Sequence, residues 1–221
     1  MTDLTAPPAT IAIALLSDTT FGSGQPTAGE VDMEIDADEA GLPRISAKAI
    51  HGLLRSAWDA MAPAFNDMAE SAADVLGTTR DHRTGPLLRV GTARVDAETR
   101  AWVDYAATRT TNPIGSRRVL DAMTDIRIQT AMDRRSGAPA RRSLRMTRVV
   151  SSPVAGEKQP VTLIAPLNWL RPPDGAHIRV LALMALGVRH GGVARSRGSG
   201  HIQLSIDGDI AATVLTARGS H

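Results

Sequence analysis

The 221-residue sequence contains no cysteine. Disulfide bonds and thiolate metal sites are therefore excluded, and this absence is typical of proteins that work in a reducing compartment. The sequence also lacks a secretory signal and an apolar run long enough to span a bilayer, since the longest run, residues 178–188, contains Arg179. We therefore expect a cytoplasmic protein that does not contact a membrane.

Lysines and aromatic residues are also scarce. Lys48 and Lys158 are the only lysines among 25 basic residues, so nearly all of the positive charge belongs to arginine. The planar guanidinium group of arginine suits a two-pronged contact with phosphate. Three tryptophans, two phenylalanines and one tyrosine are too few for a base-stacking surface of the RNA-recognition-motif kind. If RNA binds, we expect contacts with its phosphate backbone to dominate.

The net charge of +2 conceals an uneven distribution of charge along the chain. Residues 1–77 contain 3 basic and 12 acidic side chains, whereas residues 78–148 contain 15 and 7. A basic region of this kind indicates nucleic-acid binding. A GC-rich genome also enriches arginine, so composition alone leaves open an α+β domain that is unrelated to RNA.

Short periodic segments separated by glycine and proline predict a mixture of strands and helices. We expect strands at residues 10–16, 87–95, 125–130, 143–150, 161–166 and 201–206. We expect helices after Ser46 and at residues 65–76, 97–107 and 176–188. Residues 110–118 are predicted to form an exposed loop that carries Arg117 and Arg118, and residues 1–9 and 218–221 to form flexible ends.

An acidic stretch precedes the first expected helix. The acids Glu30, Asp32, Glu34 and Asp36 alternate with apolar residues, which predicts a strand with all of its carboxylates on one face. Such a face repels itself. It is typical of an edge strand that uses charge to prevent aggregation, or of a carboxylate used in metal-assisted chemistry.

The helix after Ser46 has two different sides. Ser46 is a good N-cap, and Ile50, Leu54 and neighbouring apolar residues recur at helical spacing. The cationic residues of the helix fall on another face: Lys48, His51 and Arg55. That face is either an ordinary solvated surface or a surface that binds an anion.

Two breaker-rich segments carry further arginines. Residues 133–142 form a predicted hairpin tip flanked by two arginine pairs, Arg134 with Arg135 and Arg141 with Arg142. Residues 191–200 form a glycine-rich turn with Arg195 and Arg197 just before the last strand. Glycine lets the backbone approach a phosphate closely while guanidinium groups hold it. Each segment could equally be a solvated or flexible loop.

Four motifs in this order resemble the RAMP (repeat-associated mysterious protein) superfamily of CRISPR proteins, and most closely the repeated backbone subunit of type III effector complexes. The motifs are Gly29-Glu30-Val31-Asp32, the stretch from Leu42-Pro43 through His51-Gly52 to Arg55, Val75-Leu76-Gly77, and the turn at residues 191–200. The family's usual Ile-Pro-Gly-Ser-Ser is changed before this helix, and His51 replaces a frequent lysine. Both departures suggest a divergent subtype.

The resemblance implies an α+β fold with a ferredoxin-like (RRM-like) core, an antiparallel sheet, an inserted thumb β-hairpin and helical insertions. A single domain over residues 1–221 would have its core at residues 10–60 and 160–207. The helical insertion and its loop would lie at residues 63–86, and the thumb hairpin at residues 125–150, where residues 132–144 resemble the part that wedges into the guide–target duplex.

The resemblance also implies a function. Copies of the chain would line up on a guide CRISPR RNA beside other effector subunits and cleave complementary target RNA with Mg²⁺. Asp32 would be the catalytic residue, with unidentified further metal ligands, and Asp36 and Asp38 would be solvated. We expect RNA contacts from Lys48, His51, Arg55, Arg117, Arg118, Arg134, Arg135, Gly192, Arg195, Arg197, Gly198 and Gly200.

Two related functions remain open. One is a non-catalytic RNA-binding backbone or cap subunit in which Asp32 has no chemical role. The other is a metal-independent endoribonuclease that processes guide RNA, with His51 or His82 as general acid or base.

Overall fold

The computed structural model describes residues 6–24, 30–77, 85–133, 135–141, 143–151, 159–193 and 198–219. In chain order the elements are β1 (Thr10–Leu15), β2 (Arg44–Ile45), α1 (Ala47–Met61), η1 (Ala62–Ala64), η2 (Asn66–Met68), α2 (Ala69–Leu76), β3 (Leu88–Val90), β4 (Ala93–Arg94), α3 (Ala97–Thr108), α4 (Ser116–Met123), β5 (Thr124–Gln129), β6 (Arg145–Val150), β7 (Thr162–Trp169), α5 (Gly175–Gly187), β8 (Ile202–Ile206) and α6 (Ile210–Arg218). None of the helices in these described ranges is long and apolar enough to cross a membrane.

The main sheet is antiparallel and has the strand order β2-β4-β7-β1-β8, with β3 also paired to β7. The elements β1, α1, β4, β7, α5 and β8 therefore form a β-α-β-β-α-β unit in which the first strand lies between the third and the fourth. This is the ferredoxin-like arrangement. The predicted fold class, an α+β domain with an antiparallel sheet and an inserted hairpin, is confirmed.

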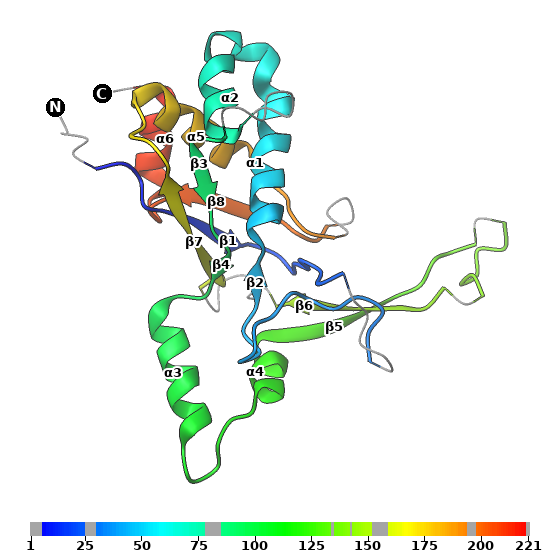
Figure 1. Cartoon of the computed structure of the whole chain (residues 1–221). Helices are drawn as coiled ribbons and strands as arrows, with labels where there is room; N and C mark the ends of the chain where they lie inside the picture. Colours follow the sequence, from blue (N-terminus) through cyan, green and yellow to red (C-terminus); the bar gives the residue numbers. More distant parts are fainter. Residues whose placement is uncertain are drawn as a thin grey trace.

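The core lies between this sheet and the helices α1, α2 and α5, which gather on one side of it in Figure 1. Ile11 and Ile13 of β1, Ile50 and Leu54 of α1 and Leu181 of α5 have no exposed surface. Helix α5 is apolar on almost every side, and that composition fits a helix enclosed by α1, α2, α6 and β8.

A smaller apolar cluster joins α3 and α4 to the segment after the acidic stretch through Leu42, Val103 and Val119. The prediction of an exposed loop over residues 110–118 is wrong at its end, because α4 begins at Ser116. Arg117 and Arg118 therefore lie in the first turn of a helix. Packing of Val119 against Leu42 gives this short, polar segment the buried side that stabilises it as a helix.

The acidic stretch does not form the predicted regular strand. Its residues make isolated bridges instead, Gly22 with Ile35 on one side and Met33 with Thr147 on the other. The prediction that Asp36 and Asp38 are solvated is also wrong. Asp36 accepts a 2.7 Å hydrogen bond from Arg44, and Asp38, whose side chain is 8% exposed, pairs with Arg100. Arginines from other elements therefore neutralise the repulsion that one shared face would create.

The predicted hairpin is confirmed as β5 and β6, paired from Thr124 with Val150 to Gln129 with Arg145. It projects away from the main sheet in Figure 1. A two-stranded ribbon of this kind has little core of its own, so its base must be held by the rest of the domain.

Parts of the expected flexible ends are held by hydrogen bonds. Ala9 N–H donates to Asp207 (3.0 Å), and Trp169 Nε1 donates to the carbonyl oxygen of Pro8 (2.8 Å). The C-terminal helix α6 was not predicted. It begins after the Asp209 N-cap, and Gly219 follows it with a left-handed backbone.

Candidate nucleic-acid interface

Asp32 lies against β6 of the hairpin, beside Met146, and is exposed to solvent. Its N–H donates to the carbonyl oxygen of Met146 (2.8 Å), and its carboxylate oxygen Oδ2 accepts from Met146 N–H (2.7 Å). Among the described residues, none binds the other carboxylate oxygen, Oδ1. One oxygen of Asp32 is therefore fixed on strand β6 while the other is left for an external partner.

The acidic stretch is held on both sides. On the β6 side, Arg148 N–H donates to the carbonyl oxygen of Met33 (3.0 Å). On the other side, Asp36 N–H donates to Phe21 and Ser23 N–H donates to Glu34. Residues 30–36 thus lie between β6 and the segment that follows β1. These contacts fix the position along β6 at which Asp32 meets the hairpin.

Arg117 and Arg118 flank this place from the start of α4. Arg117 is 53% exposed and donates to Glu30 (2.6 Å) and to Asp121 (3.1 Å). These hydrogen bonds, first to Glu30 and then to Asp121, raise the pKa of the Arg117 guanidinium. Arg118 is exposed. Arg117 therefore reaches the acidic stretch directly, and its surface ion pairs are weak enough for a phosphate to replace them.

The cationic face of α1 is organised differently from the sequence prediction. His51 Nε2 lies 3.0 Å from the carbonyl oxygen of Leu76, and Arg55 Nη2 donates to the carbonyl oxygens of Leu76 (3.0 Å) and Gly77 (2.6 Å). These two side chains satisfy carbonyl groups left unpaired at the end of α2. Lys48, on the same side of the helix, is exposed. The predicted RNA contacts of this face stay predictions.

Gly52 lies in the middle of α1, next to His51, and a Cβ atom at this position would meet no described atom within 4 Å. Folding therefore does not require glycine here, and we expect Gly52→Ala to raise the free energy of unfolding by about 0.5–1 kcal/mol. Thermal denaturation would measure this gain. If the RNA backbone passes over this side of α1, the same variant should lose RNA affinity, so a more stable protein with unchanged affinity would place the RNA elsewhere.

The glycine-rich turn meets the same region from a third direction. Val193 N–H donates to the carbonyl oxygen of Thr20 (2.8 Å), and Gly200 N–H donates to that of Asp18 (2.8 Å). Thr20 Oγ1 in turn donates to the carbonyl oxygen of Arg148 in β6 (2.8 Å). The segment after β1 therefore connects the turn to the base of the hairpin.

The three glycines predicted to bind RNA in this turn, Gly192, Gly198 and Gly200, all have positive φ angles of 74° to 83°. Arg195 and Arg197 lie outside the described residues, as do Arg134 and His82. Arg135, at the hairpin tip, is described and exposed. The structure therefore brings Asp32, Arg117 and the glycine-rich turn to one region, and places Lys48, His51 and Arg55 on α1 and Arg135 at the hairpin tip.

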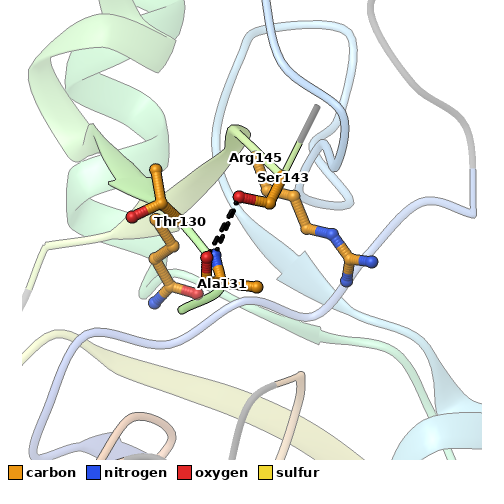
Figure 2. Close-up of a pocket in the computed structure, with 5 residues that line it drawn as sticks. Thr130, Ala131, Ser143 and Arg145 are labelled. Atoms are coloured by element: carbon orange, nitrogen blue, oxygen red, sulfur yellow. Dashed lines mark hydrogen bonds between the residues drawn. The ribbon is translucent and has the colours of Figure 1, made fainter. Parts of the chain in front are cut away.

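An open hollow of about 500 Å³ lies along the hairpin beyond Asp32. It is lined by Gln129, Thr130, Ala131, Ser143 and Arg145. Figure 2 shows the Ser143 hydroxyl group between the strands, where it accepts from Ala131 N–H (3.1 Å). Arg145 directly precedes the Met146 that holds Asp32. The hollow thus presents hydroxyl, amide and guanidinium groups, and its Arg145 is one residue away from the partner of Asp32 on β6.

Sequence reasoning missed Arg148, which is the largest charged side chain in the core. A signal was present, because Met146, Arg148 and Val150 share one face of β6 and an arginine interrupts two apolar residues. Its partners come from distant parts of the chain, so the sequence did not reveal them.

The residues present are compatible with one mode of Mg²⁺ binding. In the described part of the chain, no three His, Asp or Glu side chains are arranged to hold a metal ion. Mg²⁺ usually keeps several waters and takes one or two carboxylates together with phosphate oxygens of a substrate. Asp32 fits this mode because its second oxygen is available. A site completed by RNA is therefore compatible with these residues.

The strand order and the projecting hairpin define a ferredoxin-like α+β domain with an inserted thumb, and solved structures share this design over almost their whole length. One is a chain in the cryo-EM structure of Type III-B Cmr-beta bound to cognate target RNA, with a TM-score of 0.66 and 13% sequence identity. The alignment covers 94% of this chain and 99% of that one. A chain in the apo-state structure of Type III-B Cmr-beta matches with a TM-score of 0.65 and 14% sequence identity. That alignment covers 92% of this chain and 98% of the other.

At this level of identity the shared property is the fold. No family model matches the sequence, and no curated protein matches it. The likeness agrees with the fold that the sequence motifs imply.

Proposed function

We propose that this chain is an RNA-binding subunit of a type III CRISPR effector complex of the Cmr kind, and that it cleaves target RNA paired with a guide. The placement of Asp32 supports this proposal most directly. An exposed carboxylate rests on strand β6 of a projecting hairpin, in a chain that resembles, over 94% of its length, a chain of a structure bound to cognate target RNA.

In this proposal the guide RNA is held mainly by its phosphates. Arg117 and the glycine-rich turn lie near the hairpin, Arg118 adds an exposed charge at the start of α4, and Lys48 adds another on α1. Arginine-dominated binding without an aromatic platform predicts an affinity that falls steeply as the salt concentration rises. An RNA affinity that is independent of salt would contradict this assignment.

The hairpin and Asp32 would act on the target strand. A ribbon that enters the guide–target duplex can separate a nucleotide from its neighbours and bring the 2′-hydroxyl group into line with the scissile phosphate. The hollow beside Arg145 has room and polar groups for part of that nucleotide. Asp32 would orient the reacting groups through Oδ1.

Asp32 would be one ligand of Mg²⁺, and oxygen atoms of the RNA would be the others. When bound, the ion supplies positive charge that stabilises the reacting phosphate. The chain itself contributes a carboxylate whose position is set by Met146. The neighbouring Glu30 and Glu34 are both in contact with arginine, and this pairing limits their competition for the ion.

Cleavage of complementary RNA tests the proposal. We would purify the effector complex through a tagged copy of this chain, with its guide, and add complementary or unrelated RNA in Mg²⁺ or in EDTA. We expect regularly spaced cuts only in complementary RNA and only with Mg²⁺. Binding without any cut would make the chain a non-catalytic backbone or cap subunit.

Cuts that persist in EDTA would favour metal-independent chemistry by a histidine. His51 is poorly placed for that role in the structure. The carbonyl group of Leu76 can only accept a hydrogen bond, so His51 Nε2 must carry the proton. This N–H group is therefore already used in a hydrogen bond to the end of α2.

A further inference from the structure

Arg148 is a buried cation at the base of the hairpin. Its side chain is 2% exposed, although it belongs to a two-stranded ribbon that otherwise projects from the domain. Its Nη1 donates to Thr124 Oγ1 (3.2 Å) on the neighbouring strand. A buried arginine is costly unless several acceptors surround it, so its partners indicate what it does.

Three carboxylates from two separate parts of the chain converge on this guanidinium group. Nη2 lies 3.3 Å from Glu30, Nε lies 2.9 Å from Glu34, and Nη1 lies 3.3 Å from Asp121 of α4. The Nε–H bond is not directed at the Glu34 oxygen, so that contact is an ion pair without a hydrogen bond. Glu34 is itself only 15% exposed. Two of the three partners flank Asp32 in sequence, one on each side.

The backbone repeats the same connection. Arg148 N–H donates to the carbonyl oxygen of Met33, the residue after Asp32, and Met146 N–H donates to Asp32 Oδ2. The side chain of Arg148 therefore contacts Glu30 and Glu34, while its backbone N–H binds Met33. Any sliding of the acidic stretch along β6 would break these contacts together and would move Asp32 from Met146.

We infer that Arg148 is the positioning residue of Asp32: it fixes the acidic stretch on the hairpin so that Oδ2 is held by Met146 and Oδ1 faces the RNA. This inference rests on the proposed function for its catalytic meaning. Arg148 itself does not touch the RNA, because it is buried.

Arg117 differs from Arg148 in a way that supports this assignment. Both contact Glu30 and Asp121, but Arg117 is 53% exposed and does not contact Glu34 among the described residues. An exposed pair is weak and readily exchanged, whereas loss of a buried partner leaves charges uncompensated. Of these two arginines, Arg148 is therefore the one that can hold the stretch permanently.

The test replaces Arg148 by methionine, which has a similar length and no charge. In the isolated full-length chain, the NMR signal of the Met146 amide should shift, because its hydrogen bond to Asp32 is lost or lengthened. In the complex, the single-turnover cleavage rate should fall about 100-fold, since a displacement of about 1 Å has that effect. The affinity for RNA should stay within about threefold, because Arg148 is not a phosphate ligand.

Two further variants make the result specific. The cleavage rate of Arg148→Lys should be about tenfold higher than that of Arg148→Met. Lysine restores the charge but not the planar guanidinium group that reaches three carboxylates. Arg127→Met is the matched control. Arg127 lies on the adjacent strand and also pairs with two carboxylates, but it is 47% exposed, so the rate and the Met146 signal should be unchanged.

An unmoved Met146 signal together with a normal rate in Arg148→Met would overturn the inference. If Arg148→Met does not fold, Glu34→Gln carries the test, with an expected rate about tenfold lower and a smaller shift of the same signal. A shifted Met146 signal in Arg148→Met, combined with normal cleavage by Asp32→Asn, would refute the catalytic role of Asp32 and leave its positioning by Arg148 intact.

Discussion

Replacing Asp32 by asparagine is expected to lower the rate of target-RNA cleavage by about 1,000-fold. Asparagine has the same shape, and its amide oxygen can still accept the Met146 N–H bond that the carboxylate accepts in the structure. The change therefore removes the negative charge without disturbing the acidic stretch. A carboxylate that shares a Mg²⁺ ion with the substrate is worth several kcal/mol in the transition state, and about 4 kcal/mol corresponds to this loss of rate.

Asp36→Asn provides the matched control for this measurement. Asp36 belongs to the same stretch, but its carboxylate is occupied by Arg44 at 2.7 Å. We expect its cleavage rate to stay within about threefold of the unchanged protein. RNA affinity, measured in the same preparations, should be equal in both variants. Normal cleavage by Asp32→Asn would refute a catalytic role for Asp32 and favour the non-catalytic subunit.

Gly192→Ala should destabilise the folded protein strongly, whether or not RNA binds. Gly192 has a φ angle of +79°, which an alanine adopts only with strain. A Cβ atom there would also lie well inside van der Waals contact of the Thr20 carbonyl oxygen. We expect the free energy of unfolding to fall by about 3 kcal/mol, which lowers the Tm of a chain of this size by about 6–12 °C.

Gly198→Ala separates backbone strain from this steric clash. Gly198 has a similar φ angle of +83°, but none of the described atoms lies within 4 Å of an added Cβ. We therefore expect a loss of only about 1 kcal/mol. Equal losses in the two variants would show that the approach of Gly192 to Thr20 does not matter for stability. A loss of RNA affinity in Gly198→Ala alone would assign the outer part of the turn to RNA.

Sequence reasoning was most successful where a segment's own pattern decides its structure. Helix α5 is apolar almost throughout, and β1, β7 and β8 are rich in β-branched and aliphatic residues, so burial follows from composition. The hairpin was predicted because breaker residues separate two strand-like segments. Ser46 was identified as the N-cap of α1, and its hydroxyl oxygen accepts from Ala49 N–H in the structure.

Prediction failed where a distant partner decides the structure. Residues 116–123 look polar and loop-like, and α4 forms because Val119 packs against Leu42, far away in sequence. The acidic stretch has the alternation of a strand, but its carboxylates are drawn to Arg44, Arg100 and Arg148 in different directions. Local alternation does not record where those arginines lie.

The sequence by itself determined the α+β class and the hairpin with its basic tip, and its resemblance to a known superfamily indicated Asp32 as the acid most worth testing. Only the tertiary structure decided that Asp32 rests on Met146, that His51 and Arg55 hold the end of α2, and that Arg148 is buried among three carboxylates. The physical reason is the range of the interactions. Hydrophobic periodicity and capping depend on residues close in sequence, whereas the arrangement of charges at this site depends on contacts between residues up to 118 positions apart.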